Sequence, residues 1–154
     1  MKNIVVKMML DRGVNIEDIA NLVYFLQSKY CKLTIEECIS CVDRVLEKRE
    51  VQHAILTGIA LDILAEQDKL EEPLLSILKK DESLYGIDEI LALSITNIYG
   101  SIGLTNFGYL DKEKIGILKE LNIKGPRVHT FLDDLVAGIA AAASARIAHS
   151  KADS

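Results

Sequence analysis

The segment from Ala137 to Ala145 consists almost entirely of Ala, Gly and Ser. Around it, larger apolar residues recur on one stripe at helical spacing, from Leu132 to Ile147. Small side chains barely project from a helix, so the axes of several neighbouring helices can approach it closely. The segment therefore predicts a long C-terminal helix at the centre of a helical bundle.

Capping signals mark two helices in the N-terminal half. Asn15 with Asp18, and Thr34 with Glu37, have the spacing of capping boxes, in which each side chain satisfies a free backbone N–H group of the other residue. Apolar residues at helical spacing follow both signals. We therefore expect one helix over residues 16–29 and a second that begins after Thr34.

Glycine and proline punctuate the next three helices. A third helix is expected from Val51, in which Gly58 allows the close approach of a neighbour instead of breaking the helix. Pro73 fits the first turn of a short helix that ends at Lys80, because proline lacks the N–H group that this turn leaves free anyway. Gly86 precedes a further helix.

The uncharged stretch over residues 90–110 is about 20 residues long, which is enough to cross a bilayer. Its glycines and asparagines favour two buried helices joined near Gly100 instead. A short helix is expected over residues 114–121. Thr130 with Asp133 then predicts a capping box at the start of the last helix.

These patterns predict an all-α fold, a compact bundle of about six helices around the Ala-rich C-terminal helix. No segment shows the alternation of a β-strand. The length of 154 residues suits a single domain over residues 1–154. A formal net charge of -5 argues against a nucleic-acid partner, because such binding depends on Lys and Arg side chains that neutralise phosphates.

The three cysteines favour the reducing cytoplasm, because an odd number cannot all pair in disulfides. Cys38 and Cys41 form a C-x-x-C, but a second cysteine pair is missing. Both lie in the apolar stripe of a predicted helix, which favours burial as small apolar side chains over zinc binding.

Two adjacent acid pairs, Asp88 with Glu89 and Asp133 with Asp134, each precede an apolar run in a predicted helix. The positive end of the helix dipole explains one acid in a first turn, and helix capping is one interpretation of both pairs. The second acid of each pair is not needed for capping. If the two helix ends meet, their carboxylates repel one another unless a cation intervenes. Mg²⁺, which prefers oxygen ligands, is the expected ion, held by these four residues.

Further polar residues extend this acidic pattern. Asp111, Lys112 and Lys114 occur together in YLDKEK, and His129 lies just before the last helix. An acidic protein that acts on an anionic phosphate needs a metal ion or local cations to offset repulsion, and these side chains can supply contacts to a phosphate. Exposed lysines and a loop histidine are also common without any such role.

The order of these motifs resembles the phosphatidylglycerophosphatase A family. Asp88 and Glu89 match its W-D-E segment, Asp111 and Lys114 match its D-x-x-K-P, and FLDDLVAG matches its I-D-D-x-x-A-G. The chain looks most like the soluble branch of Gram-positive bacteria, sometimes named low-temperature-requirement protein. It departs from the family pattern in lacking the P-G-T motif and in having Ile115 in place of the proline.

The resemblance implies an Mg²⁺-dependent phosphoric monoester hydrolase that converts phosphatidylglycerophosphate to phosphatidylglycerol. On this hypothesis the catalytic acids are Asp88, Asp111 and Asp134, and the contacts of the substrate phosphate are Lys112, Lys114 and His129. The expected partner is a phosphorylated small molecule or lipid head group, met by a cytoplasmic protein in peripheral contact with the inner face of the membrane. We also expect a homo-oligomer, with the apolar segment from Ile4 to Leu10 as its surface of self-association.

Two alternatives stay open. Glu47 and Glu50 form an E-x-x-E, half of the signature of the all-α nucleoside triphosphate pyrophosphohydrolases, which also bind Mg²⁺ through helical carboxylates. A non-catalytic protein that binds a phosphorylated ligand, or a structural helical oligomer, fits the departures from the family pattern. Metal-dependent release of phosphate distinguishes these possibilities.

Overall fold

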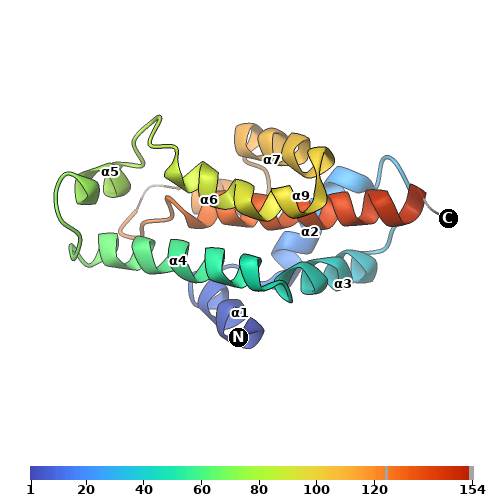
Figure 1. Ribbon diagram of the computed structural model, residues 1–154, viewed down its shortest axis with the longest axis horizontal. Helices are drawn as coiled ribbons and strands as arrows, with labels where there is room; N and C mark the ends of the chain where they lie inside the picture. Colours follow the sequence, from blue (N-terminus) through green and yellow to red (C-terminus); the bar gives the residue numbers. More distant parts are fainter. Residues whose placement is uncertain (124, 153–154) are drawn as a thin grey trace.

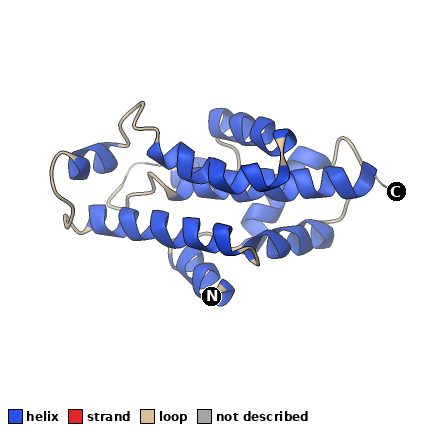
Figure 2. Cartoon of the chain, viewed as in Figure 1, coloured by secondary structure: helices blue, strands red, loops and turns tan. Residues whose placement is uncertain are grey.

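Helices account for all the regular structure in the computed structural model, which describes residues 1–123 and 125–152 (Figure 2). In chain order the elements are α1 (Lys2–Asp11), α2 (Ile16–Gln27), α3 (Ile35–Leu46), α4 (Arg49–Glu66), α5 (Leu74–Lys80), α6 (Ile87–Thr96), the 3-10 helix η1 (Asn97–Tyr99), α7 (Ser101–Glu113), α8 (Ile117–Leu121) and α9 (Leu132–Ala152). The all-α fold class is confirmed.

The described residues form nine α-helices, more than the roughly six expected. Helix α1 begins without a side-chain cap, and α5 and α8 span only 7 and 5 residues. Short or uncapped helices leave little periodic signal in a sequence, because most of their stability comes from tertiary packing.

Helix α9 lies at the centre of the bundle, as the sequence predicts. It runs along the longest axis of the molecule (Figure 1) and packs against α2, α3, α4, α6, α7 and α8. Every residue from 130 to 145 is buried. An alanine-rich surface makes this possible, because its neighbours can come close on all sides without meeting long side chains.

Two of the three predicted capping boxes are confirmed. At the start of α2, the Asp18 N–H donates to Asn15 Oδ1 at 2.7 Å, and the Asn15 N–H donates to Asp18 Oδ2 at 3.0 Å. Thr34 and Glu37 exchange the same pair of bonds at the start of α3. Both boxes are local, so their spacing in the sequence was a sufficient signal.

The predicted capping box of Thr130 with Asp133 at α9 is wrong. The Thr130 hydroxyl donates instead to the carbonyl oxygen of Leu78, at 2.6 Å. The backbone N–H groups of Phe131 and Leu132 donate to the two carboxylate oxygens of Asp62 in α4, each at 3.0 Å. A side chain some 70 positions away in sequence therefore satisfies this buried helix end.

The predicted helix over residues 114–121 is also wrong at its start. Lys114 lies just beyond the end of α7 with a φ of 50°, in the left-handed region, and α8 begins only at Ile117. Gly116, with a φ of 56°, completes the break. The turn directs Lys114 away from the path of α7 and towards the start of α9.

The predicted break near Gly100 is confirmed, because η1 and Gly100 separate α6 from α7. The uncharged stretch over residues 90–110 is thus divided between two helices of the bundle. None of the helices in the described residues has the length and hydropathy needed to cross a membrane.

Close packing at Gly58 supports the predicted role of this glycine in α4. A Cβ added there would overlap Leu135 Cδ1 and lie 3.0 Å from Phe131 Cβ. Gly138 plays the same part in α9, where an added Cβ would lie 3.1 Å from the Ala92 carbonyl oxygen of α6. Both glycines let a neighbouring helix approach closely.

Gly58→Val should lower the free energy of unfolding by about 1–3 kcal/mol, because its branched side chain would have to displace Leu135 and Phe131. Gly108→Ala is the matched control, since an added Cβ at this exposed position of α7 meets nothing within 4 Å in the described residues. The control should stabilise the protein by about 0.5–1 kcal/mol. Urea unfolding followed by circular dichroism measures both, and equal effects would contradict this packing.

Candidate active site

The acid pairs meet in one pocket of about 230 Å³, where the starts of α6 and α9 adjoin the end of α7. Six of the predicted site residues line it: Asp88, Glu89, Asp111, Lys114, Asp133 and Asp134. The starts of α6 and α9 bring their positive dipole ends to the same place, which favours negative groups there. Helix packing thus gathers five carboxylates that lie up to 46 positions apart in sequence.

Lys114 lies between the carboxylates. Its Nζ is 2.9 Å from Asp111 Oδ1, 3.2 Å from Asp133 Oδ2 and 3.9 Å from Asp134 Oδ1. Burial alone would lower the pKa of this amine, but the charge of Asp133 and the hydrogen bond and charge of Asp111 outweigh it and raise the pKa. Lys114 is therefore a fixed cation that offsets part of the negative charge of the pocket.

One ammonium group does not balance the acid cluster. Burial raises the pKa of both Asp133 and Asp134, whose side chains are almost completely inaccessible to solvent. The charge of Asp133 and hydrogen bonds with Asp111 and Asp88 raise the Asp134 pKa further. The Glu89 pKa is also raised, by burial and then by the charges of Asp111 and Asp88. The pocket therefore favours an added proton or cation.

The donor set suits Mg²⁺ in its chemistry, because this ion prefers carboxylate oxygens and retains several waters. All four predicted ligands, Asp88, Glu89, Asp133 and Asp134, line the pocket. In the described part of the chain, no three His, Cys, Asp or Glu side chains have the mutual arrangement of a metal-coordinating group.

Two predicted phosphate contacts lie outside this pocket. Lys112 is exposed on α7 and is not among the lining residues. His129 lines a smaller neighbouring pocket of about 90 Å³, which shares Asp81 and Asn122 with the acidic one. Burial, followed by the nearby charge of Arg12, lowers the pKa of His129. Of the three predicted contacts, only Lys114 is close to the carboxylates.

The sequence reasoning missed lining residues that come from loops. Asp81, Tyr85 and Asn122 belong to no helix, so no periodic pattern marks them. The Tyr85 ring packs edge-on against Phe131, with ring centres 6.0 Å apart. Burial and the charge of Asp88 raise the pKa of its hydroxyl. Tyr85 thus connects the wall of the pocket to the core beneath α9.

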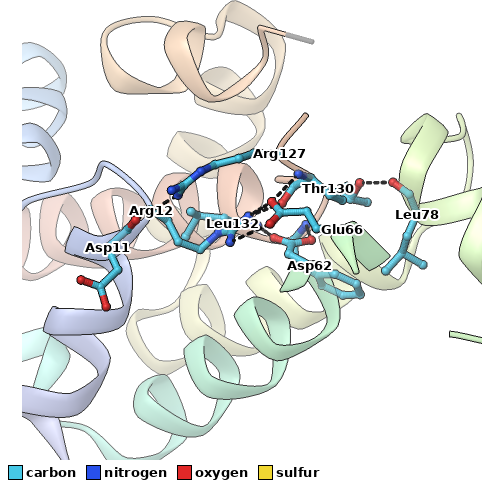
Figure 3. A network of polar contacts seen from close by, with 10 residues as sticks. Asp11, Arg12, Asp62, Glu66, Leu78, Arg127, Thr130 and Leu132 are labelled. Atoms are coloured by element: carbon cyan, nitrogen blue, oxygen red, sulfur yellow. Dashed lines mark hydrogen bonds and ion pairs between the residues drawn. The ribbon is translucent and has the colours of Figure 1, made fainter. Parts of the chain in front are cut away.

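A polar network lies under the start of α9 (Figure 3). Arg12, at the end of α1, binds the Glu66 carboxylate of α4 and donates to the carbonyl oxygen of Val128 at 2.7 Å. Glu66 in turn accepts from the Val128 N–H at 2.6 Å. Burial raises the Glu66 pKa, but the hydrogen bonds from Arg12 and Val128 outweigh it and lower the pKa overall.

Asp62 completes this network and is fully buried. Burial raises its pKa to about 8, although its hydrogen bonds with Phe131 and Leu132 act in the opposite direction. One signal in the sequence pointed to it, because Asp62 interrupts the apolar stripe of α4. An acid at a core position is rarely tolerated without a partner, so its presence predicts a buried acceptor.

Residues of the E-x-x-E and C-x-x-C motifs lie outside the acidic pocket. Glu47 and Glu50 are exposed at the junction of α3 and α4, and neither lines the acidic pocket. Cys38 is fully buried in α3, and burial raises the pKa of its thiol to about 11. The expected burial is confirmed for Cys38, whereas Cys41 is only partly buried.

Fold and pocket together define a class of all-helical proteins that gather carboxylates at converging helix ends. A comparison of sequences identifies the family within that class: residues 5–149 match the family described as phosphatidylglycerophosphatase A. The chain belongs to this family of phosphatases that act on phosphatidylglycerophosphate. The resemblance seen in the motifs is confirmed.

Three similar proteins come from species of Bacillus and Listeria. The chain is 66% identical over 143 residues to the protein YutG of Bacillus subtilis (strain 168), covering 92% of this chain and 86% of YutG. A solved protein of unknown function from Bacillus stearothermophilus has a TM-score of 0.95 at 60% identity, covering 97% of this chain and 94% of that chain. The low temperature requirement C protein of Listeria monocytogenes has a TM-score of 0.96 at 56% identity, covering 99% and 97% respectively.

Asp134→Asn should stabilise the fold at alkaline pH. Because its pKa is raised, the folded protein holds the Asp134 proton more tightly than the unfolded chain, whose aspartates titrate near pH ~4. This stabilising contribution is complete below about pH 4 and is lost as the pH rises towards the folded pKa. We expect the variant to raise the free energy of unfolding by about 0.5–2 kcal/mol at pH 8, and by less at pH 5.

Urea titrations with a chelator present measure this difference. Glu71→Gln is the control, because it removes an exposed acid from the loop before α5 and should change stability by less than about 0.5 kcal/mol at either pH. An Asp134→Asn protein less stable than wild type at pH 8 would mean that the ionised carboxylate supports the fold.

Proposed function

We propose that the protein is an Mg²⁺-dependent phosphatase that hydrolyses the terminal phosphomonoester of phosphatidylglycerophosphate, giving phosphatidylglycerol. The main support is a pocket lined by five of the predicted acids, three of which lie within 4 Å of Lys114, in a chain that belongs to the phosphatidylglycerophosphatase A family. Hydrolysis of a phosphate monoester is very slow without a catalyst, so an enzyme must neutralise charge at the phosphoryl group. A pocket that favours added cations meets this requirement.

In this proposal Asp88, Glu89, Asp133 and Asp134 hold the ion. When bound, Mg²⁺ supplies a Lewis acid that polarises the phosphoryl oxygens and lowers the pKa of a bound water. Lys114 contributes the second positive charge. Its ammonium group has three donors, so it can keep its bond to Asp111 while donating to a phosphoryl oxygen.

Asp111 is suited to accept the proton of the attacking water. It borders the pocket, is only partly buried, and is outside the proposed ligand set. The water oxygen forms a bond to phosphorus as the bond from phosphorus to the alcohol oxygen breaks, and the alcohol oxygen takes up a proton. Asp88 and Asp134, which both line the pocket, complete the set of catalytic acids proposed from the sequence.

The pocket opening has apolar neighbours that suit a lipid substrate. Leu84, which lines the pocket, is fully exposed, and Ile87 and Ile90 on the first turns of α6 are about half exposed or more. These side chains support peripheral contact with the membrane surface in which the lipid head group lies. Self-association is a further part of the proposal, and Ile4 and Leu10 are the exposed apolar residues of α1 that support it.

Phosphate release from phosphatidylglycerophosphate in detergent, with Mg²⁺ or with a chelator, tests this function. Asp133→Asn should lower kcat by at least about 10²-fold while the protein keeps its helical content, because the variant loses a charged oxygen beside Lys114. Glu113→Gln, which changes an exposed acid at the end of α7, should retain activity.

Two further substrates separate the alternatives. A soluble phosphomonoester shows whether the lipid portion matters, and a nucleoside triphosphate tests pyrophosphohydrolase activity. Chelator-insensitive release would contradict the role of the metal. Absence of release from every substrate would leave a protein that binds a phosphorylated ligand without turnover.

A further inference from the structure

The start of α9 is held from across the fold. Both oxygens of the Asp62 carboxylate accept backbone N–H groups, from Phe131 and Leu132, and the next residue along the chain is Asp133. The other helices with side-chain caps, α2 and α3, use the adjacent residues Asn15 and Thr34. Only at α9, within the described residues, does a different helix supply the cap.

This arrangement is an unusual solution for capping alone. An acid is costly to bury in a core, and Asp62 lies close enough to Asp133 for their charges to interact unfavourably when both are ionised. A neutral residue such as the threonine at the start of α3 would satisfy N–H groups without that repulsion. Capping alone therefore does not explain an acid at position 62, and an effect of Asp62 on the adjacent pocket would explain it.

The surrounding contacts immobilise the same backbone. Arg12 and Glu66 clamp both polar groups of Val128, and Thr130 is tied to Leu78 of α5. Figure 3 shows these side chains gathered from α1, α4 and α5 around the segment that leads into α9. The chain is thus fixed at positions 128, 130, 131 and 132, immediately before the acid pair.

We propose that Asp62 is a positioning residue, which fixes the first turn of α9 so that the Asp133 and Asp134 carboxylates converge on Lys114. This inference rests on the proposed function of the pocket. Asp62 accepts two backbone N–H groups, and these bonds set the orientation of the first turn of α9. The turn then directs Asp133 Oδ2 towards Lys114 Nζ, 3.2 Å away. Catalytic geometry is sensitive to displacements of about 1 Å, which can cost ~10²-fold in rate.

Asp62→Asn tests the proposal, because the amide keeps the size of the side chain but replaces one acceptor with a donor that faces an N–H group. We expect kcat to fall about 10–100-fold with KM within about threefold of wild type, as for groups that orient catalytic residues. Thr34→Ala is the matched control: it removes the cap of α3, far from the pocket in sequence, and should lose stability without losing kcat. Unfolding measurements verify that all proteins are folded under assay conditions.

A crystal structure of Asp62→Asn gives a second readout that does not depend on turnover. We expect Asp133 to lie beyond hydrogen-bond distance of Lys114 in the variant. An unchanged Asp133–Lys114 contact together with a wild-type kcat would overturn the positioning role. Equal kcat losses in Asp62→Asn and Thr34→Ala would also overturn it, since loss of stability would then explain both.

Further measurements keep the two proposals distinguishable. If Asp62→Asn does not fold, Glu66→Gln loosens the same segment through Val128 at a partly exposed position and should show a smaller kcat loss. If wild-type protein releases no phosphate, the proposed function fails. Two measurements then test the positioning role without turnover. The first is the Asp133–Lys114 contact in the variant structure. The second is Mg²⁺ affinity by calorimetry, which should weaken about tenfold in the variant if wild type binds the ion.

Discussion

Close approach of neighbouring helices to α9 is the constraint on which the rest of this structure depends. Its alanine and glycine residues leave so little side chain that six helices pack against it, and its surface is buried over some four turns. Gly58 and Gly138 have the same effect. Because they lack side chains, α4 can pack closely against α9, and α9 can pack closely against α6. Around α9 the core therefore combines close contact between helix backbones with the large apolar side chains of the surrounding helices.

Burying α9 also buries its first turn, which has two consequences. The free N–H groups of a helix start cannot be left to water inside a core, so another part of the chain has to supply acceptors. In addition, negative side chains on that turn lose their hydration and require compensation. Asp62 meets the first requirement and Lys114 part of the second. The chemistry of the pocket and the packing of the bundle are thus two results of one arrangement.

Local patterns predicted most of the fold correctly, whereas the start of α9 depends on a contact between distant parts of the chain. The boxes at Asn15 and Thr34, the break at Gly100 and the close approach at Gly58 depend on neighbouring residues or on residue size. The start of α9 depends on Asp62, nearly 70 positions away, and no spacing rule connects them.

The same distinction applies to the pocket. Acids in first turns were recognisable as pairs, and the order of motifs indicated which pairs belonged together. Whether His129 reached the carboxylates depended on the path of a loop, which places it in the neighbouring pocket, while Lys112 lies on an exposed face of α7. The loop residues Tyr85 and Asn122 carry no periodic signal at all.

The backbone of Lys114 has a consequence for how this position can vary. Its left-handed φ of 50° strains any residue with a branched or long side chain by about 1–2 kcal/mol, and glycine or asparagine would relieve that strain. The left-handed conformation of Lys114 costs local stability, but it directs the amine towards the start of α9. At the end of a regular helix the amine would point in another direction. Glycine at position 114 would therefore relieve the backbone strain but remove the ammonium group that compensates Asp111 and Asp133, so the two effects on stability oppose each other.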